Sequence, residues 1–118
     1  MTGEHTLERF RRIRRSSDYK RTNLEGKRYH TNHFIVIVNF GQNCSRLGLT
    51  VSRKVGNAVY RNHLKRWLRE YFRNNYRLFS QAVDISIIAR RQSGPLSYRQ
   101  VVQELLTVFA RLETDDHV

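Results

Sequence analysis

Residues 56–73 read "GNAVYRNHLKRWLREYFR" and combine dense positive charge with aromatic and aliphatic side chains. At about 100° per residue, the apolar side chains fall within one arc of a helix and the cations within a separate arc. The apolar arc contains Tyr60, Leu64, Trp67, Leu68, Tyr71, Phe72, Leu78 and Phe79. The polar arc contains Arg61, Asn62, Lys65, Arg66, Arg69, Arg73 and Arg77. The pattern predicts one long amphipathic helix from about Val59 to Phe79, with Asn57 as its N-cap.

The charged side of this helix carries mainly one sign. Cations four residues apart, such as Arg61, Lys65 and Arg69, repel each other and destabilise a helix by about 0.2–0.5 kcal/mol per pair. A surface that served only solubility would mix both signs, whereas the planar guanidinium of arginine suits bidentate contact with phosphate. The helix is therefore predicted to face a polyanion. Arg53 and Lys54 extend the same surface, and Gly56 between them and the helix permits a close approach or a positive φ.

The whole chain is strongly basic. Its 118 residues include 22 Lys and Arg against 10 Asp and Glu, a formal net charge of +12. A chain of this length is expected to form one domain, and a charge of this sign attracts nucleic acid before other partners. Cys44 is the sole cysteine, so no internal disulfide is expected. With no signal peptide and no apolar run approaching the ~20 residues of a membrane span, a cytoplasmic protein is expected. Nothing in the sequence indicates an oligomer.

Runs rich in β-branched and aromatic residues predict the strands. They lie at 34–40, 46–52 and 84–90, with 27–31 as a candidate short strand. Because only the turn at 41–45 separates the first two, these are expected to form a hairpin. The third strand must return through the long basic helix, as a helical crossover.

The N-terminal part of the chain is expected to hold a short helix behind a basic arm. Residues 1–15 carry many arginines and are predicted to be a partly flexible arm. The helix is expected over 16–25, with Ser16 or Ser17 as its N-cap and Gly26 ending it.

A further helix is expected at the other end of the chain, over 98–112. Its start is marked by Ser97 and Gln100, which have the spacing of a capping box. The folded domain is thus predicted to cover 16–112, and the acidic residues 113–118 to form a frayed tail.

Strand alternation separates two faces of the predicted sheet. One face is consistently apolar and is the expected core: Phe34, Val36, Val38, Phe40, Leu47, Leu49, Val51, Ile85, Ile87 and Ala89. The other is mixed: Ile35, Ile37, Asn39, Gly48, Thr50, Ser52, Asp84, Ser86, Ile88 and Arg90. With Tyr19 at its edge, the mixed face fits a groove for single-stranded nucleic acid, and it fits a half-solvated surface equally well.

The stretch "VSRKVGNAVYRNHLKRWLRE", residues 51–70, closely resembles the signature of the bacterial ribonuclease P protein subunit. The matching positions are gap-free: Gly48 to Ser52, Arg53-Lys54, Gly56-Asn57-Ala58-Val59, Arg61-Asn62, Lys65-Arg66 and Arg69. A looser resemblance extends from about Arg9 to Leu112. It implies an α+β fold: a two-layer α/β sandwich with a three- to four-stranded mixed sheet and helices at both ends of the chain. It also implies a left-handed β-α-β crossover, whereas right-handed crossovers are the general rule.

The same resemblance implies a function. In that family catalysis belongs to a large RNA subunit, which uses Mg²⁺, and the holoenzyme cleaves precursor tRNA endonucleolytically to mature its 5′ end. The protein binds the RNA subunit, holds the single-stranded 5′ leader of precursor tRNA and raises the affinity for Mg²⁺. No small-molecule cofactor is expected, and no metal ligand is assigned to the protein.

The family's contact residues transfer by position. Those expected to bind the RNA subunit are Arg53, Lys54, Gly56, Asn57, Arg61, Asn62, Lys65, Arg66, Arg69 and Arg73. Those expected to line the leader groove are Tyr19, Ile35, Ile37, Thr50, Ser52 and Arg90. The sequence departs from relatives at Asn23 and Ile37, where an aromatic residue can stand. Leader stacking is therefore expected to be weaker, or to use Ile35 and Ile37 as an apolar floor.

Other functions fit the residues less well. A nuclease acting alone needs clustered carboxylates or a positioned base, and the acids form no close motif. His30 and His33 in "HTNH" lack zinc spacing and fit surface or phosphate-contact roles better than metal ligation. A general RNA binder, such as a ribosomal protein or an RNA chaperone, is the main alternative. A major-groove DNA reader fits poorly, because the basic helix is apolar on nearly half its circumference.

Overall fold

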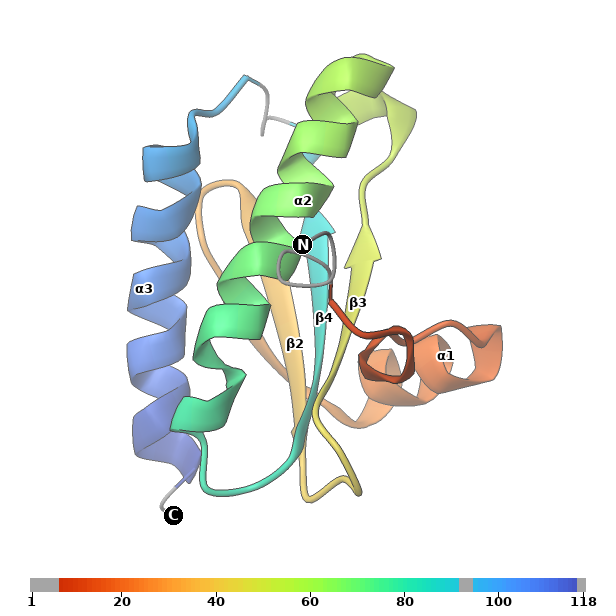
Figure 1. Ribbon diagram of the computed structural model, residues 1–118, viewed down its shortest axis with the longest axis vertical. Coiled ribbons are helices and arrows are strands. Elements are labelled where there is room, and N and C mark those ends of the chain that lie inside the picture. Colours follow the sequence, from red (N-terminus) through yellow and green to blue (C-terminus); the bar gives the residue numbers. More distant parts are fainter. Residues whose placement is uncertain (1–6, 92–94, 117–118) are drawn as a thin grey trace.

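The computed structural model describes residues 7–91 and 95–116 of the chain. The main elements are α1 (Ser16–Glu25), β1 (Lys27–His30), β2 (Phe34–Phe40), β3 (Arg46–Thr50), α2 (Ala58–Asn75), β4 (Val83–Ala89) and α3 (Tyr98–Asp116). They form a mixed four-stranded sheet with α2 and α3 side by side along one face, while α1 packs against the other face near the β3 edge (Figure 1). The predicted α+β fold is confirmed.

The strand order is β1-β2-β4-β3, with β3 and β4 parallel and the other neighbours antiparallel. The predicted hairpin of 34–40 with 46–52 is therefore wrong, because β4 lies between β2 and β3. Nearly every residue of β4 is buried, which explains why this strand takes the interior position. The hairpin is formed instead by β1 and β2, which confirms the candidate short strand at 27–31.

The connection from β3 through α2 to β4 is left-handed. In Figure 1 both strands point upward and α2 lies in front of the sheet, and the chain passes from β3 on the right to β4 on the left. A right-handed crossover would move the other way. This confirms the hand that the family resemblance implied and that general topology rules would have rejected.

The core lies between the sheet and the two long helices. The predicted apolar face is confirmed, since Phe34, Val36 and Ile85 are fully buried there. From α2 the core receives Leu64, Leu68, Tyr71 and Phe72, and from α3 it receives Val101, Leu105, Val108, Phe109 and Leu112. The apolar side of α2 is thereby fixed inward, so its cationic side is directed away from the core.

The α2 helix begins as predicted and ends earlier. Asn57 is its N-cap, and the Asn57 Oδ1 accepts a hydrogen bond from the Tyr60 backbone N–H at 2.9 Å. The helix ends at Asn75, and a 3₁₀ turn at Tyr76–Leu78 follows. The predicted continuation of the helix to Phe79 is wrong, and Leu78 is largely exposed.

The other two helices differ from expectation at one end each. The N-cap of α1 is Arg15, without a side-chain bond, and Ser16 already lies inside the helix. The capping box of α3 is confirmed by hydrogen bonds from Ser97 N to Gln100 Oε1 (2.8 Å) and from Gln100 N to Ser97 Oγ (3.2 Å). The helix continues to Asp116, so a frayed tail beginning at residue 113 is wrong, and residues 117–118 lie outside the described part.

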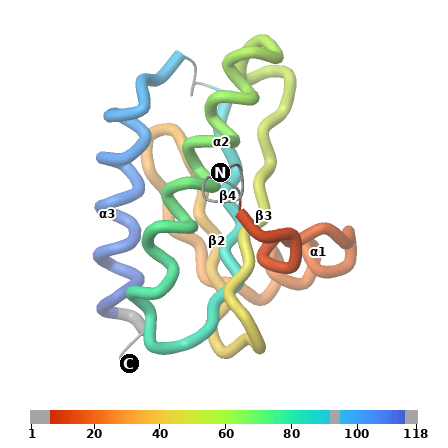
Figure 2. The backbone as a smooth tube through the Cα atoms, in the orientation of Figure 1, coloured from red at the N-terminus to blue at the C-terminus, as the bar shows by residue number. Residues whose placement is uncertain are grey.

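The N-terminal segment from residue 7 packs on the sheet edge. Leu7 and Ile13 are buried. Arg12 forms an isolated parallel β-bridge with Leu47 of β3, and the Ile13 backbone N–H donates to the Leu47 carbonyl at 2.9 Å. Figure 2 shows this segment beside β3 and α1. The flexibility expected at the very start of the arm concerns residues 1–6, which lie outside the described part.

Candidate nucleic-acid interface

Helix α2 carries a continuous polar surface along the side opposite its core contacts. This surface, the α2 ridge, consists of Arg61, Asn62, Lys65, Arg66, Arg69 and Arg73. Asn62 and Arg66 are exposed, and Arg61, Lys65, Arg69 and Arg73 are half-buried. The structure thus brings all the α2 residues predicted to bind RNA onto one surface.

The cations of the α2 ridge have no acidic partner within residues 7–91 and 95–116. Ion pairs in that part of the chain are made by residues outside the ridge, among them Arg11, Arg21, Arg46 and His33. On the ridge itself, Arg61 Nε donates to the Gly56 carbonyl at 3.1 Å, and Arg66 Nη2 lies 3.1 Å from His63 Nδ1. The buried Arg73 Nε lacks a hydrogen-bond partner among the described residues. The ridge keeps its positive charge available to an external anion.

The segment before α2 extends the cationic surface. Arg53 and Lys54 lie in an exposed 3₁₀ turn directly before the helix. Gly56 has an extended φ of 168°, so the positive-φ alternative is excluded. Its role is close approach, since a Cβ at this position would lie 2.7 Å from Tyr60 Cδ2. Gly56 and the capping residue Asn57 therefore shape the start of the helix.

The α2 ridge meets the N-terminal segment in a cationic hollow at the β3 edge. The walls include Arg12, Arg14, Lys65 and Arg69 together with Tyr19. Burial lowers the pKa of Arg69, and the nearby charge of Arg12 lowers it further. Both effects disfavour isolated positive charge at this place, so a bound anion would relieve them.

On the opposite face of the sheet, α1 covers one half and leaves the other half open. The covered half includes Ile37, Gly48 and Ser86, which are all buried. The open half includes a row across the strands formed by His30, Ile35, Ile88 and Thr50, which are exposed or half-buried. Ser52 and Arg90 follow at the same end. The prediction that Ile37 lines the groove is wrong, because this residue lies fully buried under α1.

Tyr19 of α1 is fixed against the edge strand β3. Its hydroxyl accepts a hydrogen bond from the Leu49 backbone N–H at 3.1 Å and reaches the Leu49 carbonyl at 3.5 Å. A Cβ on Gly48 would lie 2.5 Å from Tyr19 Cε1, so glycine at this position makes room for the ring. The ring is half-buried and lines the cationic hollow. Tyr19 thus stands between the α2 ridge and the sheet face that carries Thr50.

A charged cluster that sequence reasoning missed anchors α1 to the sheet. Arg46 donates to Asp84 through Nε (3.0 Å) and Nη2 (2.8 Å), and to Asp18 of α1 through Nη1 (3.2 Å). The hydrogen bond with Asp84 is the main reason that the pKa of Arg46 is raised. The sequence did contain a signal. Asp84 lies in a predicted strand, on the mixed face of the sheet that α1 covers, and a buried carboxylate requires a cation nearby.

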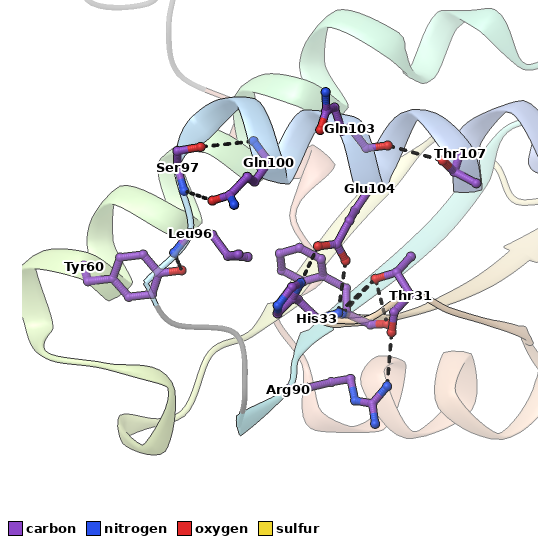
Figure 3. Close-up of polar contacts among 11 residues, drawn as sticks. Thr31, His33, Tyr60, Arg90, Leu96, Ser97, Gln100, Gln103, Glu104 and Thr107 are labelled. Atoms are coloured by element: carbon purple, nitrogen blue, oxygen red, sulfur yellow. Dashed lines mark hydrogen bonds and ion pairs between the residues drawn. The ribbon is translucent and has the colours of Figure 1, made fainter.

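A second polar network positions Arg90 at the end of the open half (Figure 3). The Arg90 Nη1 donates to the Thr31 carbonyl at 3.1 Å, and the Thr31 Oγ1 accepts from the Phe34 backbone N–H at 2.9 Å. His33 beside Thr31 is tied to α3, since its backbone N–H donates to Glu104 Oε1 at 3.0 Å and its Nδ1 pairs with Glu104 Oε2. His33 is therefore paired with a carboxylate rather than free to contact phosphate.

Two further properties concern the described ranges only. No group of three or more His, Cys, Asp or Glu in them is arranged to hold a metal ion. No helix in them is both long enough and apolar enough to cross a membrane.

The left-handed crossover defines the fold as an unusual α+β sandwich. The cationic ridge, which has no acidic partner among the described residues, is typical of a protein that binds a polyanion. The sequence matches the Ribonuclease P family over residues 7–113. It is 41% identical over 102 residues to the ribonuclease P protein component of Geobacter sp. strain M21, which covers 86% of this chain and 87% of the relative. It is 42% identical over 101 residues to that of Syntrophus aciditrophicus, with 85% of each chain covered.

A solved structure agrees with these relatives. The RNase P protein of Staphylococcus aureus superposes with a TM-score of 0.79 at 31% identity, over 87% of this chain and 95% of that one. The chain belongs to the ribonuclease P protein family. It acts as the protein component of a ribonucleoprotein endoribonuclease in tRNA processing, and an RNA is its partner in that complex.

Proposed function

We propose that the α2 ridge, with Arg53 and Lys54, binds the catalytic RNA subunit. The observation that carries this proposal is the one-signed charge of the ridge, which has no carboxylate partner among the described residues. The same helix buries its apolar side in the core, so a binding partner reaches only the cationic side. Phosphates of an RNA backbone have the charge and the geometry that guanidinium groups bind in pairs of hydrogen bonds.

The open half of the sheet is the proposed track for the 5′ leader of precursor tRNA. Its row of Ile35, Ile88 and Thr50 offers a flat surface of apolar and hydroxyl groups beside Arg90. Tyr19 stands at the β3 edge, next to the cations of the α2 ridge. Single-stranded RNA is bound by such a combination of stacking surface and cationic track, with a tolerance for sequence. Since the leader belongs to an RNA made and matured inside the cell, the proposed place of action is the cytoplasm.

Mg²⁺ is proposed to act on the RNA side of the complex. The described residues do not fit a site of their own for this ion, because Asp18 and Asp84 are both engaged by Arg46. Mg²⁺ prefers carboxylate, phosphate and water oxygens, and the phosphates of the RNA supply these. The contribution of the protein would be to neutralise neighbouring phosphates and so hold the RNA in a form that binds the ion.

Reconstitution tests the proposed function directly. The protein is added to a bacterial ribonuclease P RNA at a Mg²⁺ concentration too low for the RNA alone to cleave precursor tRNA. Restored cleavage at the 5′ end is expected, while the protein without RNA should leave the substrate intact. Cleavage by the protein alone, or no effect of the protein on the RNA, would contradict the proposal.

Replacing Tyr19 with alanine should reduce the affinity gained from the leader. Base stacking on an aromatic ring contributes about 1–3 kcal/mol, so precursor tRNA should bind the reconstituted enzyme roughly fivefold to hundredfold more weakly. Mature tRNA, which lacks the leader, should bind unchanged. Tyr19→Phe is the matched control, because it keeps the ring and loses only the hydrogen bonds to Leu49. Equal losses for precursor and mature tRNA would show that Tyr19 acts on the fold rather than on the leader.

A further inference from the structure

A stack of aromatic rings and a guanidinium group runs from the core to the surface near residue 10. Phe72 is fully buried and stacks on Tyr76, with ring centroids 5.3 Å apart and planes 18° from parallel. The Arg11 guanidinium carbon lies 4.5 Å from the Tyr76 centroid and 4.7 Å from the Phe10 centroid. Phe10 ends the series and is 54% exposed. The stack therefore terminates in a ring that is open to an external partner.

The exposure of Phe10 belongs to an ordered segment. Arg11 Nη1 donates to the Ser45 carbonyl at 3.2 Å, and Arg12 Nε donates to the Leu7 carbonyl at 3.1 Å. Ile13 is buried and pairs with β3 immediately afterwards. Single exposed apolar side chains are common on proteins and need no function. What distinguishes Phe10 is its surroundings: the Arg11 guanidinium packs on its ring, and two hollows that contain charged side chains adjoin it.

Two hollows share Phe10, Asp18 and Arg46 in their walls. The first has a volume of about 560 Å³ and adds Arg12, Arg14 and Arg15. The second has a volume of about 370 Å³ and adds the cation Arg21 together with the amides of Gln42 and Asn43. The acid in both walls is Asp18, which accepts from Arg46 at 3.2 Å and pairs with Arg21 at 3.8 Å, and Arg46 also donates to the buried Asp84. The second hollow is therefore balanced in charge, whereas the first keeps the positive charges of Arg12, Arg14 and Arg15 beside an aromatic ring.

We propose that Phe10 is a stacking platform for an unpaired nucleobase of RNA, whose flanking phosphates are held by Arg14 and Arg15. An aromatic ring beside cations is the combination that binds single-stranded nucleic acid, because every base has a face that can stack. Arg11, held between Tyr76 and Phe10, keeps the ring in place from beneath. This inference rests on the proposed function and adds a site away from the open half of the sheet. The nucleotide comes either from the RNA subunit or from the substrate leader.

The test measures binding by Phe10→Ala, Phe10→Leu and Phe10→Trp variants. One arm titrates a bacterial ribonuclease P RNA alone, and the other compares precursor tRNA with mature tRNA on the reconstituted enzyme. Phe10→Ala and Phe10→Leu should each lose roughly fivefold to hundredfold in one arm, and Phe10→Trp should keep full affinity. A loss in the first arm identifies the RNA subunit as the source of the base, and a loss confined to precursor tRNA identifies the leader. Leu24→Ala, at an exposed apolar position of α1, is the control and should change neither arm.

Two results would overturn the stacking site while leaving the proposed function intact. The first is unchanged affinity of Phe10→Ala in both arms, with an unaltered protein that binds and restores cleavage normally. The second is full affinity of Phe10→Leu, which would show that an apolar contact suffices without stacking. Failure of the unaltered protein to bind the RNA would instead remove the proposed function and this site together. Thermal unfolding of each variant separates a binding loss from a loosened N-terminal segment.

Discussion

Replacing Arg66 and Arg69 together with alanine should weaken binding to the ribonuclease P RNA by roughly tenfold or more per residue, because each loses charge-assisted hydrogen bonds to phosphate. The dependence of affinity on salt should change as well. The slope of log K against log salt should become shallower by roughly 0.7–0.9 for each lost phosphate contact. Affinity measured at several salt concentrations provides both quantities. The fold should survive, since neither side chain belongs to the core cluster.

Two matched variants separate charge from geometry. The double Arg66→Lys and Arg69→Lys variant keeps the charges, so it should retain the salt slope and lose affinity only where the bidentate contact matters. Arg99→Ala removes one exposed arginine from α3, away from the α2 ridge, and should leave the slope unchanged. A double alanine variant whose slope equals that of the unaltered protein would remove phosphate contact from the α2 ridge.

Replacing Arg46 with methionine should cause the largest loss of stability. Asp84 is 0% exposed, and Arg46 supplies two hydrogen bonds to its carboxylate. Removing one partner of a buried ion pair leaves a buried charge uncompensated and costs about 3–5 kcal/mol. Small domains have a free energy of unfolding of about 5–15 kcal/mol in total, so the midpoint of urea unfolding should move to a much lower urea concentration. Because Arg46 also holds Asp18 of α1, leader binding through Tyr19 should fall with it.

The cause can be isolated with two further variants. Adding Asp84→Leu to Arg46→Met removes the buried charge as well, and much of the lost stability should return. Arg21 is an exposed neighbour of Asp18, and its Nη2 lies 3.8 Å from the Asp18 carboxylate. Arg21→Ala should therefore lower the free energy of unfolding by no more than about 1 kcal/mol. A single variant Arg46→Met with unchanged unfolding would show that Asp84 does not depend on this pair.

The sequence predicted most elements because their signals are local. The wheel of α2 as far as Asn75, the Asn57 cap and the Ser97–Gln100 capping box depend on residues close in the chain, and all are confirmed. The predicted continuation of the wheel to Phe79 is not. The pairing of β2 with β3 failed because strand neighbours are set by the whole sheet. Strand β4 is buried on both faces and takes the interior place between them, although a short turn suggested a hairpin.

The charge of the candidate site could be predicted from the sequence, but the contacts that hold its residues in place could be predicted less well. One-signed charge on a helix side indicates a surface without further information. The anchoring of Tyr19, by contrast, depends on Gly48 and Leu49, which lie far along the chain. The burial of Ile37 depends on where α1 crosses the sheet, and alternation within one strand cannot show this. The stack ending at Phe10 joins the N-terminal segment to the end of α2, so no single stretch of sequence contains it.

The central claim is that the α2 ridge faces RNA, and site-specific crosslinking tests it most directly. Ala58 is exposed one helical turn before Asn62, in line with the α2 ridge, and Gln103 is exposed on α3. Each is replaced with cysteine in a Cys44→Ser background and labelled with a photoreactive group. In the complex with ribonuclease P RNA, position 58 should crosslink to the RNA and position 103 should not. Crosslinking from position 103 with none from position 58 would contradict the account.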